Sequence, residues 1–314
     1  MSGSYKDINY AIRPAKSIER KMLCETFRRL SVICPVEKYR YIGFGSAYFS
    51  DFYLFHKALN FYSMHSIERD TNNSKRFEFN CPFKCIQIHF GESNAILPTL
   101  EWNNLSTIVW LDYDGNLNQN VLADIKTVCS NVSPGSVIII SVNAHPSGEA
   151  STRLDALKKL VGEERVSPSI LEKDLAQWGT AKVLRSIINN EIQETLTDRN
   201  GGLQKPAKIT YQQLLNFHYA DGAKMLTVGG ILYSQEQKDK VDNCYFDQLP
   251  FVRTQEEEYL IKVPNLTYRE LRYLDTQLPV SDISTVSLPG VSSKDIENYS
   301  NIYRYFPMFA ETDV

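Results

Sequence analysis

The amino-acid sequence predicts an α/β fold built around a doubly wound, mostly parallel sheet. Between residues 39 and 143, short apolar segments alternate with helix-spaced segments five times, which is typical of a parallel sheet with crossover helices. The first apolar segment runs into Gly43 and Gly45 before a helical segment, and the second ends in Glu68, 23 residues after Gly45. A strand, a glycine turn and a helix, with an acid at the tip of the next strand, form the unit that cradles a nucleotide.

Length and composition are those of a globular protein. The 314 residues are enough for one large α/β domain with a smaller appendage, and the 43% that are hydrophobic can form a substantial core. The net charge of -3 does not indicate a nucleic-acid partner. The polar start of the chain does not read as a secretory signal, and no apolar run approaches the ~20 residues that span a membrane. We therefore expect a cytoplasmic protein with no membrane partner.

Six cysteines are scattered along the chain. Cys81 and Cys85 are the one close pair, and no second pair follows at the spacing of a zinc site. The favoured interpretation is reduced thiols near the start of a strand, in keeping with a cytoplasmic protein.

The first half of the chain supplies five expected strands, at 39–42, 62–67, 85–90, 107–111 and 136–142. The helices between them are expected at 52–59, 71–80, 94–100 and 120–129. The fourth and fifth strands are apolar throughout, which favours strands that are covered on both faces.

The remaining chain divides the protein into four expected regions. They are an N-terminal basic helix or lid at 1–35, a Rossmann-like core at 36–143 and 221–263, a helical insertion at 144–220, and a small C-terminal helical extension at 264–314. Residues 1–12 are expected to form an arm. Strand character returns at 224–233, where Gly229-Gly230 reads as a turn or bulge, and again at 259–263. Thr267 and Glu270 fit a capping box that opens a helix.

The helix expected at 14–30 is basic, with Arg13, Lys16 and Arg20 in its first turns. The favoured interpretation is a solvated face. The alternative is a lid that brings these cations to an anionic substrate.

Polar residues follow successive strands at the point where each strand ends. They are Gly43 and Gly45 after the first, Glu68 at the second, Gly91-Glu92-Ser93 after the third, Asp112 and Asp114 after the fourth, and Asn143 after the fifth. In an open parallel sheet, ligands bind beyond the carboxyl ends of the strands. The sequence therefore predicts a nucleotide-like ligand at this edge.

These residues resemble the motifs of class I S-adenosylmethionine-dependent methyltransferases, over 38–143 and with 224–233 fitting the family's late antiparallel hairpin. The glycine motif is degenerate, with two glycines and no acid before them. The resemblance implies that the first motif holds the methionine part of the cofactor, the acid of the second strand the ribose, and the third tip the adenine. The implied cofactor-binding residues are Gly43, Gly45, Ser46, Glu68, Arg69, Gly91, Glu92, Ser93 and Asp112.

The segment from Leu111 to Asn116 resembles the O-methyltransferase branch of that family. Its metal-dependent members hold a divalent cation on acids after strands four and five, which Asp112 and Asn143 could match. Val142 stands where a further Asp is expected, and two oxygen ligands make a poor magnesium site. We therefore expect S-adenosylmethionine as the cofactor and do not predict a metal.

Methyl transfer is an in-line displacement at a sulfonium carbon, so the enzyme must align donor and acceptor, which can supply ~7–11 kcal/mol. A hydroxyl acceptor also needs a base to take its proton. Asp112 is the first candidate for that base and Asp114 the second. His145, after the fifth strand, and His218 are further candidates, although either could be a packed or exposed residue without a role.

The predicted function is a methyltransferase that acts on an oxygen atom of a small-molecule or macromolecular acceptor. One alternative is a non-catalytic module with the same fold that binds S-adenosylmethionine or a protein partner. A second alternative is a nucleic-acid-modifying methyltransferase that uses the basic helix to contact the backbone. Nicotinamide binding fits less well, because Ala47-Tyr48-Phe49 stands where its fingerprint needs a third glycine. The sequence does not indicate the acceptor or the oligomeric state.

Overall fold

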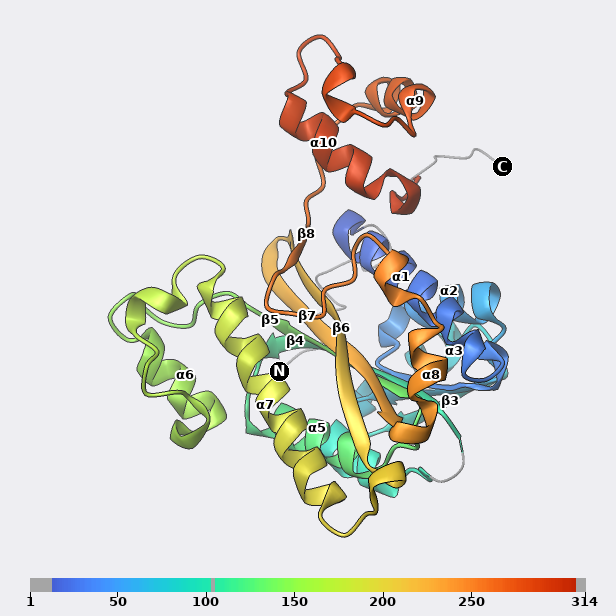
Figure 1. Ribbon diagram of the computed structural model, residues 1–314, viewed down its shortest axis with the longest axis vertical. Coiled ribbons are helices and arrows are strands. Elements are labelled where there is room, and N and C mark those ends of the chain that lie inside the picture. The colour runs from blue at the N-terminus through green and yellow to red at the C-terminus, as the bar shows by residue number, and fades with distance from the viewer. Residues whose placement is uncertain (1–12, 103–104, 309–314) are drawn as a thin grey trace.

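The computed structural model describes residues 13–102 and 105–308. Among them, eight strands form one sheet in the order β3-β2-β1-β4-β5-β7-β6-β8 (Figure 1). The strands are β1 Arg40–Gly43, β2 Ser63–Glu68, β3 Ile86–Phe90, β4 Thr107–Asn116, β5 Ser136–Asn143, β6 Ile209–Asp221, β7 Ala223–Ser234 and β8 Tyr259–Ile261. Strands β1 to β5 are parallel, and β7 runs antiparallel between β5 and β6. The predicted α/β fold class is confirmed.

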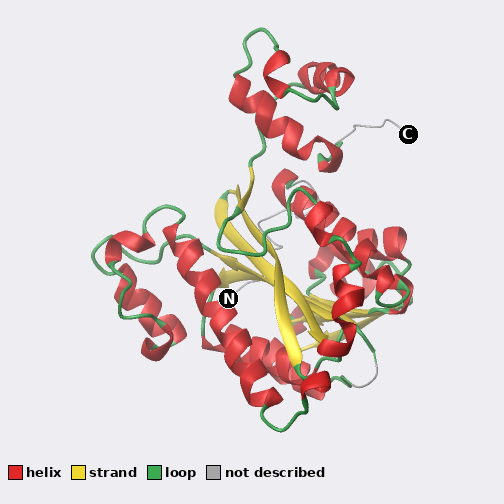
Figure 2. Cartoon of the chain, in the orientation of Figure 1, coloured by secondary structure: helices red, strands yellow, loops and turns green. Residues whose placement is uncertain are grey.

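The helices are α1 Pro14–Arg29, α2 Ser50–Leu59, α3 Ser74–Asn80, α4 Ser93–Ile96, α5 Gln119–Asn131, α6 Arg153–Val161, α7 Gly179–Asn200, α8 Lys238–Asp242, α9 Tyr268–Gln277 and α10 Ser293–Ile302. Helices α9 and α10 lie apart from the sheet (Figure 1), and helices from the rest of the chain cover both of its faces (Figure 2). The hydrophobic core is divided into two parts, one on each face of the sheet, because successive side chains of a strand point to opposite faces. Trp110 and Ile139 pack with α1 and α2, whereas Val109 and Ile138 pack with α5 and α7.

Strand β4 is five residues longer than the expected strand at 107–111. After Asp112 the register shifts, and pairing with β5 resumes at Asn116 opposite Asn143. The residues between them bulge out of the ladder. The sequence does not indicate this continuation of the strand, because the residues after Leu111 are mostly polar.

The region 144–220 differs from the helical insertion that its sequence predicts. Helices α6 and α7 lie in it, but its last residues form the long strand β6. One face of β6 is apolar, with Phe217 and Tyr219 fully buried, while Asn216 and His218 are buried on the other. The extra residue at Leu214 interrupts the alternation that marks a strand.

Gly229 and Gly230 lie in the middle of β7, not in a turn. The hairpin turns instead at Gly222, whose φ of +96° favours glycine. The bulge that the two glycines suggested occurs in the partner strand, where Leu214 is unpaired between Gln213 and Leu215. The glycines are needed because other strands approach closely, as a Cβ at Gly230 would lie 2.1 Å from the Gln212 carbonyl oxygen.

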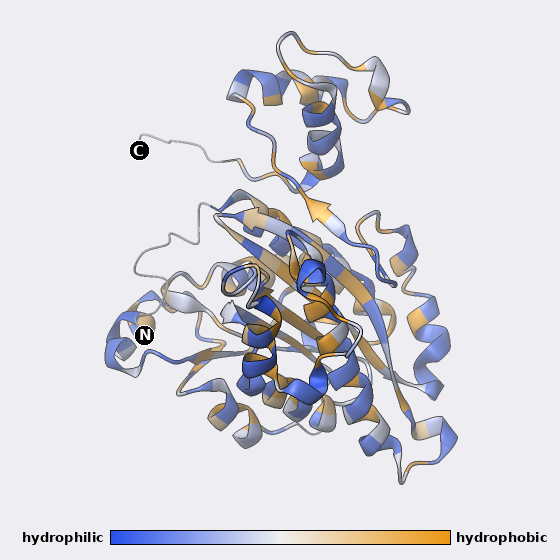
Figure 3. Ribbon diagram, turned by 90° about the vertical axis from the view of Figure 1, so that its left-hand side faces the viewer, coloured by the Kyte–Doolittle hydropathy of each residue, from blue (hydrophilic) through white to orange (hydrophobic). Residues whose placement is uncertain are grey.

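The C-terminal helices α9 and α10 form a small unit with its own core of Leu274, Ile296 and Tyr299. The predicted capping box opens α9, with Thr267 and Glu270 exchanging hydrogen bonds. Figure 3 shows apolar residues concentrated in the central strands of the sheet and polar and apolar residues mixed along the helices. The helices of the described residues include none long and apolar enough to cross a membrane. The expected arm at 1–12 lies outside the described residues.

We expect Gly230→Ala to lower the free energy of unfolding by about 1–3 kcal/mol, because the added Cβ forces two strand backbones apart. Urea denaturation of the purified protein measures this change. Gly202→Ala is the control, since a Cβ there meets no described atom within 4 Å. Equal stability of the two variants would contradict the close packing of β6 and β7.

Candidate functional site

The glycine turn after β1 is joined to β2 by a buried serine. The Gly45 N–H donates to Ser66 Oγ over 2.9 Å. A Cβ at Gly45 would lie 2.8 Å from the same oxygen, so no larger residue fits. Ser46 and Phe49 both adopt positive φ angles, 49° and 47°, which make the turn tight. The predicted turn residues Gly43, Gly45 and Ser46 therefore lie beside the tip of β2.

Glu68 is the last residue of β2. Its Oε1 accepts a hydrogen bond from the Ser66 hydroxyl over 2.6 Å. Burial raises the pKa of Glu68 to about 7, although the Ser66 hydroxyl and the Gly45 amide favour the charged form. Between its ordinary value of 4.5 and about 7, the folded protein retains a proton that the unfolded chain releases. The free energy of unfolding contributed by this group therefore falls as the pH rises through that window. The neighbouring Arg69 is exposed.

The tip of β3 is joined to β2 and to α5. The Gly91 N–H donates to the Glu68 carbonyl oxygen over 3.0 Å. Ser93 and Tyr113 both donate hydroxyl hydrogen bonds to Asp124 Oδ2, the latter over 2.6 Å. Burial raises the pKa of Asp124, and the two hydroxyl bonds act in the opposite direction. Glu92 is exposed at the same tip.

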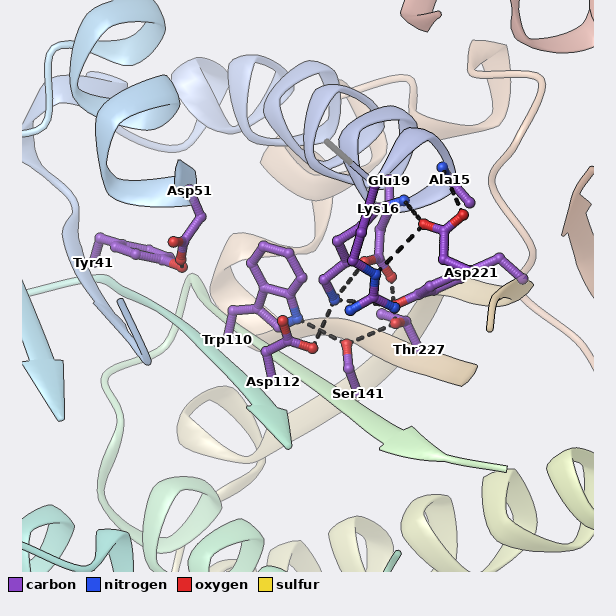
Figure 4. Close-up of polar contacts among 12 residues, drawn as sticks. Ala15, Lys16, Glu19, Tyr41, Asp51, Trp110, Asp112, Ser141, Asp221 and Thr227 are labelled. Atoms are coloured by element: carbon purple, nitrogen blue, oxygen red, sulfur yellow. Dashed lines mark hydrogen bonds and ion pairs between the residues drawn. The ribbon is translucent and has the colours of Figure 1, made fainter. Parts of the chain in front are cut away.

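Asp112 lies on the neighbouring strand β4, two residues beyond Trp110, which pairs with Gly43. Lys16 of α1 forms an ion pair with it, with Nζ 2.6 Å from Asp112 Oδ1 (Figure 4). The Asp112 side chain is 21% exposed and the Lys16 side chain 1%. Within the described part of the chain, Asp112 Oδ2 has no hydrogen-bond or ion-pair partner. The carboxylate thus has one oxygen bound by the protein and one available at the strand tip.

The Lys16 ammonium is buried among anionic, hydroxyl and aromatic groups. Its Nζ lies 2.7 Å from Glu19 Oε2 and 3.0 Å from the Tyr219 hydroxyl. It also lies 4.5 Å from the centre of the Trp110 ring, a cation–π distance. Burial alone would lower the pKa of Lys16, but the carboxylates of Asp112 and Glu19 outweigh it and raise the pKa. Lys16 is therefore a fixed cation.

A chain of hydrogen bonds continues from Glu19 into the sheet (Figure 4). Trp110 Nε1 donates to Ser141 Oγ over 2.9 Å, and Ser141 Oγ lies 2.6 Å from Thr227 Oγ1. Thr227 in turn donates to Glu19 Oε1. Since Ser141 accepts from Trp110 and Thr227 donates to Glu19, the serine hydroxyl donates to Thr227. Strands β4, β5 and β7 are thereby bonded to helix α1.

The basic helix α1 differs from the solvated face that its sequence favours. Lys16 is 1% exposed and Arg20 is 8% exposed, so both cations are buried. Asp221, at the β6–β7 turn, accepts hydrogen bonds from the Ala15 and Lys16 amides over 3.3 and 3.0 Å. An acid at the N-terminus of a helix is stabilising, and here it holds α1 in place over the sheet.

The other candidate bases differ from Asp112 in their exposure and in their neighbours. Asp114 is exposed on the bulge of β4, and His145 is exposed on the loop after β5. His218 is buried and stacks on Trp178 with ring centres 4.9 Å apart. Burial lowers the pKa of His218 to about 4. The structure therefore brings Gly43, Gly45, Glu68 and Asp112 to one edge of the sheet.

The described residues contain no group of three or more His, Cys, Asp or Glu side chains arranged to hold a metal ion. The cation next to Asp112 is the Lys16 ammonium. Cys81 and Cys85 are free thiols.

Comparison with known proteins assigns this chain to a family. The profile of a family described as "Putative O-methyltransferase" matches residues 8–314. The chain belongs to this O-methyltransferase family. A search of curated proteins finds no match.

Solved structures similar to this family member share little sequence with it. Trm1 from Pyrococcus horikoshii, solved with S-adenosyl-L-methionine, is 9% identical at a TM-score of 0.45, and the match covers 72% of this chain and 57% of that one. The O-methyltransferase TomG from Streptomyces achromogenes, in complex with SAM, is 14% identical at a TM-score of 0.35, with coverages of 65% and 78%. Cofactor-bound Rv0187 from MTB is 12% identical at a TM-score of 0.35, with coverages of 67% and 80%.

The sequence-based prediction missed several residues of the site. Ser66 and Glu19 are the most important, since one joins the glycine turn to Glu68 and the other holds Lys16. Glu19 could have been found, because it stands three residues after Lys16 and such pairs share a helix face. The contact of Lys16 with Asp112 has no sequence signal, because 96 residues separate them.

We expect Lys16→Met to lower the free energy of unfolding by about 3–5 kcal/mol, because it leaves the Glu19 and Asp112 carboxylates without their shared cation. Chemical denaturation at neutral pH measures the change. Lys57→Met, on the exposed face of α2, is the matched control and should have little effect. A Lys16 variant as stable as this control would show that the ion-pair cluster does not hold α1 on the sheet.

Proposed function

We propose that this chain binds S-adenosylmethionine at the carboxyl edge of β1 to β4 and transfers its methyl group to an oxygen atom of an acceptor. The observation that carries the proposal is the hydrogen-bonded run from Gly45 through Ser66 to Glu68 and on to Gly91. It lies where the strand order reverses between β1 and β4, which is where ligands bind in open α/β sheets.

The residues at this edge fit the cofactor. Gly45 keeps the turn tight at this edge, because a Cβ there would clash with the Phe49 ring and with Ser66 Oγ. Glu68 is the acid for the ribose hydroxyls, and Arg69 is its exposed neighbour. The β3 tip, with Gly91, Glu92 and Ser93, is the place for the adenine.

Bound S-adenosylmethionine supplies an electrophilic methyl group on a sulfonium. The protein must place the acceptor oxygen in line with that methyl group and remove its proton. Asp112 Oδ2 takes the proton in this proposal. Lys16 binds Oδ1 and so fixes the orientation of the carboxylate without acting as a base itself.

The same ion pair favours a second candidate function, a module that binds S-adenosylmethionine without catalysis, because one oxygen of the proposed base already has a partner. A nucleic-acid acceptor is supported less, since Lys16 and Arg20 of the basic helix are buried and cannot form a phosphate-binding surface.

Glu68→Gln should weaken binding of S-adenosylhomocysteine by about 1–3 kcal/mol, because a charge-assisted hydrogen bond to the ribose is lost. Binding to the unsubstituted protein should strengthen as the pH rises from about 6 to about 8, since Glu68 ionises near pH 7 and its carboxylate is the better acceptor. The variant should lose this dependence. Isothermal titration calorimetry across the pH range measures both effects.

Glu78→Gln, an exposed change on α3, is the control for that titration. No heat with the unsubstituted protein at saturating S-adenosylhomocysteine would contradict the proposed cofactor. Equal affinity and equal pH dependence in Glu68→Gln would remove Glu68 from the cofactor site.

Asp112→Asn should lower methyl transfer by about 100- to 10,000-fold while sparing most of the cofactor affinity, because the substitution keeps the shape of the side chain and removes the base. The measurement is transfer of a labelled methyl group from S-adenosylmethionine to a fractionated cell extract. Asp239→Asn, an exposed change on α8, is the control.

An Asp112→Asn variant that labels acceptors as well as the unsubstituted protein would transfer the role of base to another residue, with His145 the next candidate. If the unsubstituted protein binds the cofactor and labels nothing in any fraction, the binding-module function replaces the enzyme.

A further inference from the structure

A buried acid on helix α5 binds two of the strand tips at once. Asp124 is 1% exposed and lies on the buried side of α5, where the other buried residues are apolar. Its Oδ2 accepts hydrogen bonds from the Ser93 hydroxyl at the β3 tip and from the Tyr113 hydroxyl on β4, the latter over 2.6 Å. Its other oxygen, Oδ1, has no hydrogen-bond partner among the described residues. The two hydroxyls are therefore the partners that compensate for the burial of this acid.

Tyr113 extends the same link to the glycine turn. Its ring packs edge-on against the ring of Phe44, with ring centres 5.1 Å apart. Phe44 stands between Gly43 and Gly45. Asp124 is thus joined to the tips of β3 and β4 directly, and to the turn after β1 through Tyr113.

Tyr113 also follows Asp112 in the chain, so two adjacent residues of β4 are held from opposite faces of the sheet. Asp112 is paired with Lys16 of α1. Tyr113 packs against the core on the face of α5 and α7 and is bonded to Asp124. Backbone pairing with β5 is interrupted after Asp112, so side-chain contacts are what hold this part of β4 in place. Asp124 therefore does on one face what Lys16 does on the other.

Stability alone explains a buried acid at this position poorly. An apolar side chain would pack with its neighbours on α5 without a desolvation cost, and replacing buried polar groups in this way is often neutral or stabilising. What the carboxyl group supplies, and an apolar group does not, is one acceptor that fixes the direction of two donors from separate strands.

We propose that Asp124 is a positioning residue for the cofactor edge, and that it acts by tying the β3 tip to the β4 tip through Ser93 and Tyr113. It sets Ser93 at the place for the adenine and fixes the segment of β4 that carries Asp112, without touching the cofactor itself. This inference rests on the proposed function, because the edge that Asp124 organises is the proposed S-adenosylmethionine site.

A link between two tips is lost whether it is cut at either end or in the middle. Ser93→Ala, Tyr113→Phe and Asp124→Ala should each weaken binding of S-adenosylhomocysteine by about tenfold. The Ser93→Ala/Tyr113→Phe double variant should lose about the same factor, not the product of the two. Asp124→Asn keeps an acceptor oxygen and should recover most of the affinity that Asp124→Ala loses. Isothermal titration calorimetry with the full chain measures each affinity.

Two variants are controls for the titration. Tyr62→Phe removes the hydroxyl of a tyrosine that is 68% exposed, and Lys126→Ala changes the exposed face of α5. Both should bind S-adenosylhomocysteine as the unsubstituted protein does. Urea denaturation of the same variants separates positioning from stability, because a purely structural Asp124 would change the free energy of unfolding and leave the affinity of the folded protein unchanged.

Amide hydrogen exchange without any ligand tests the link itself. In Asp124→Ala, exchange should become faster at residues 91–93 and 112–116, because both tips lose their common partner. Lys126→Ala should leave exchange at these residues unchanged. Unchanged exchange in Asp124→Ala would show that the two tips are not tied through this residue.

Variants that bind S-adenosylhomocysteine as tightly as the unsubstituted protein overturn the inference. A double variant whose loss equals the product of the two single losses also overturns it, because the two hydroxyls would then act independently. Failure of the proposed function is distinguishable from both results. In that case the unsubstituted protein binds no S-adenosylhomocysteine, whereas faster exchange in Asp124→Ala still demonstrates the link between the two tips.

Discussion

One buried ammonium group joins helix α1 to the tip of strand β4. Lys16 lies between Glu19 and Asp112, with its Nζ 2.7 and 2.6 Å from their carboxylate oxygens. Removing a charge from water is costly, and only close partners of opposite sign compensate for it. The cluster therefore couples two requirements: α1 must cover the sheet for Lys16 to be paired, and Asp112 must keep its orientation for the same reason.

The strand tips form a continuous platform because hydrogen bonds join each to the next. Ser66 connects the glycine turn with Glu68, and the backbone of Glu68 accepts from Gly91. Burial keeps the pKa of Glu68 near 7, so this acid is costly for stability when charged and useful when a ligand supplies donors. An acid whose pKa is shifted this far by burial is typical of a functional site.

The sheet could be predicted from sequence because its parallel strands are apolar runs followed by polar tips, and this local pattern placed Glu68 and Asp112 at one edge. Strand β6 could not, since the extra residue Leu214 interrupts its alternation between Gln213 and Leu215. The burial of Lys16 was also hidden, because its partner Asp112 is 96 residues away and local patterns carry no information about such pairs.

An experimental structure of the protein with S-adenosylhomocysteine tests the central claim most directly. The account predicts the ribose hydroxyls within hydrogen-bond distance of Glu68, the ligand backbone close to Gly45, and the sulfur directed toward the side of the site where Asp112 lies. A ligand bound elsewhere on the molecule, or a ribose turned away from Glu68, would contradict it.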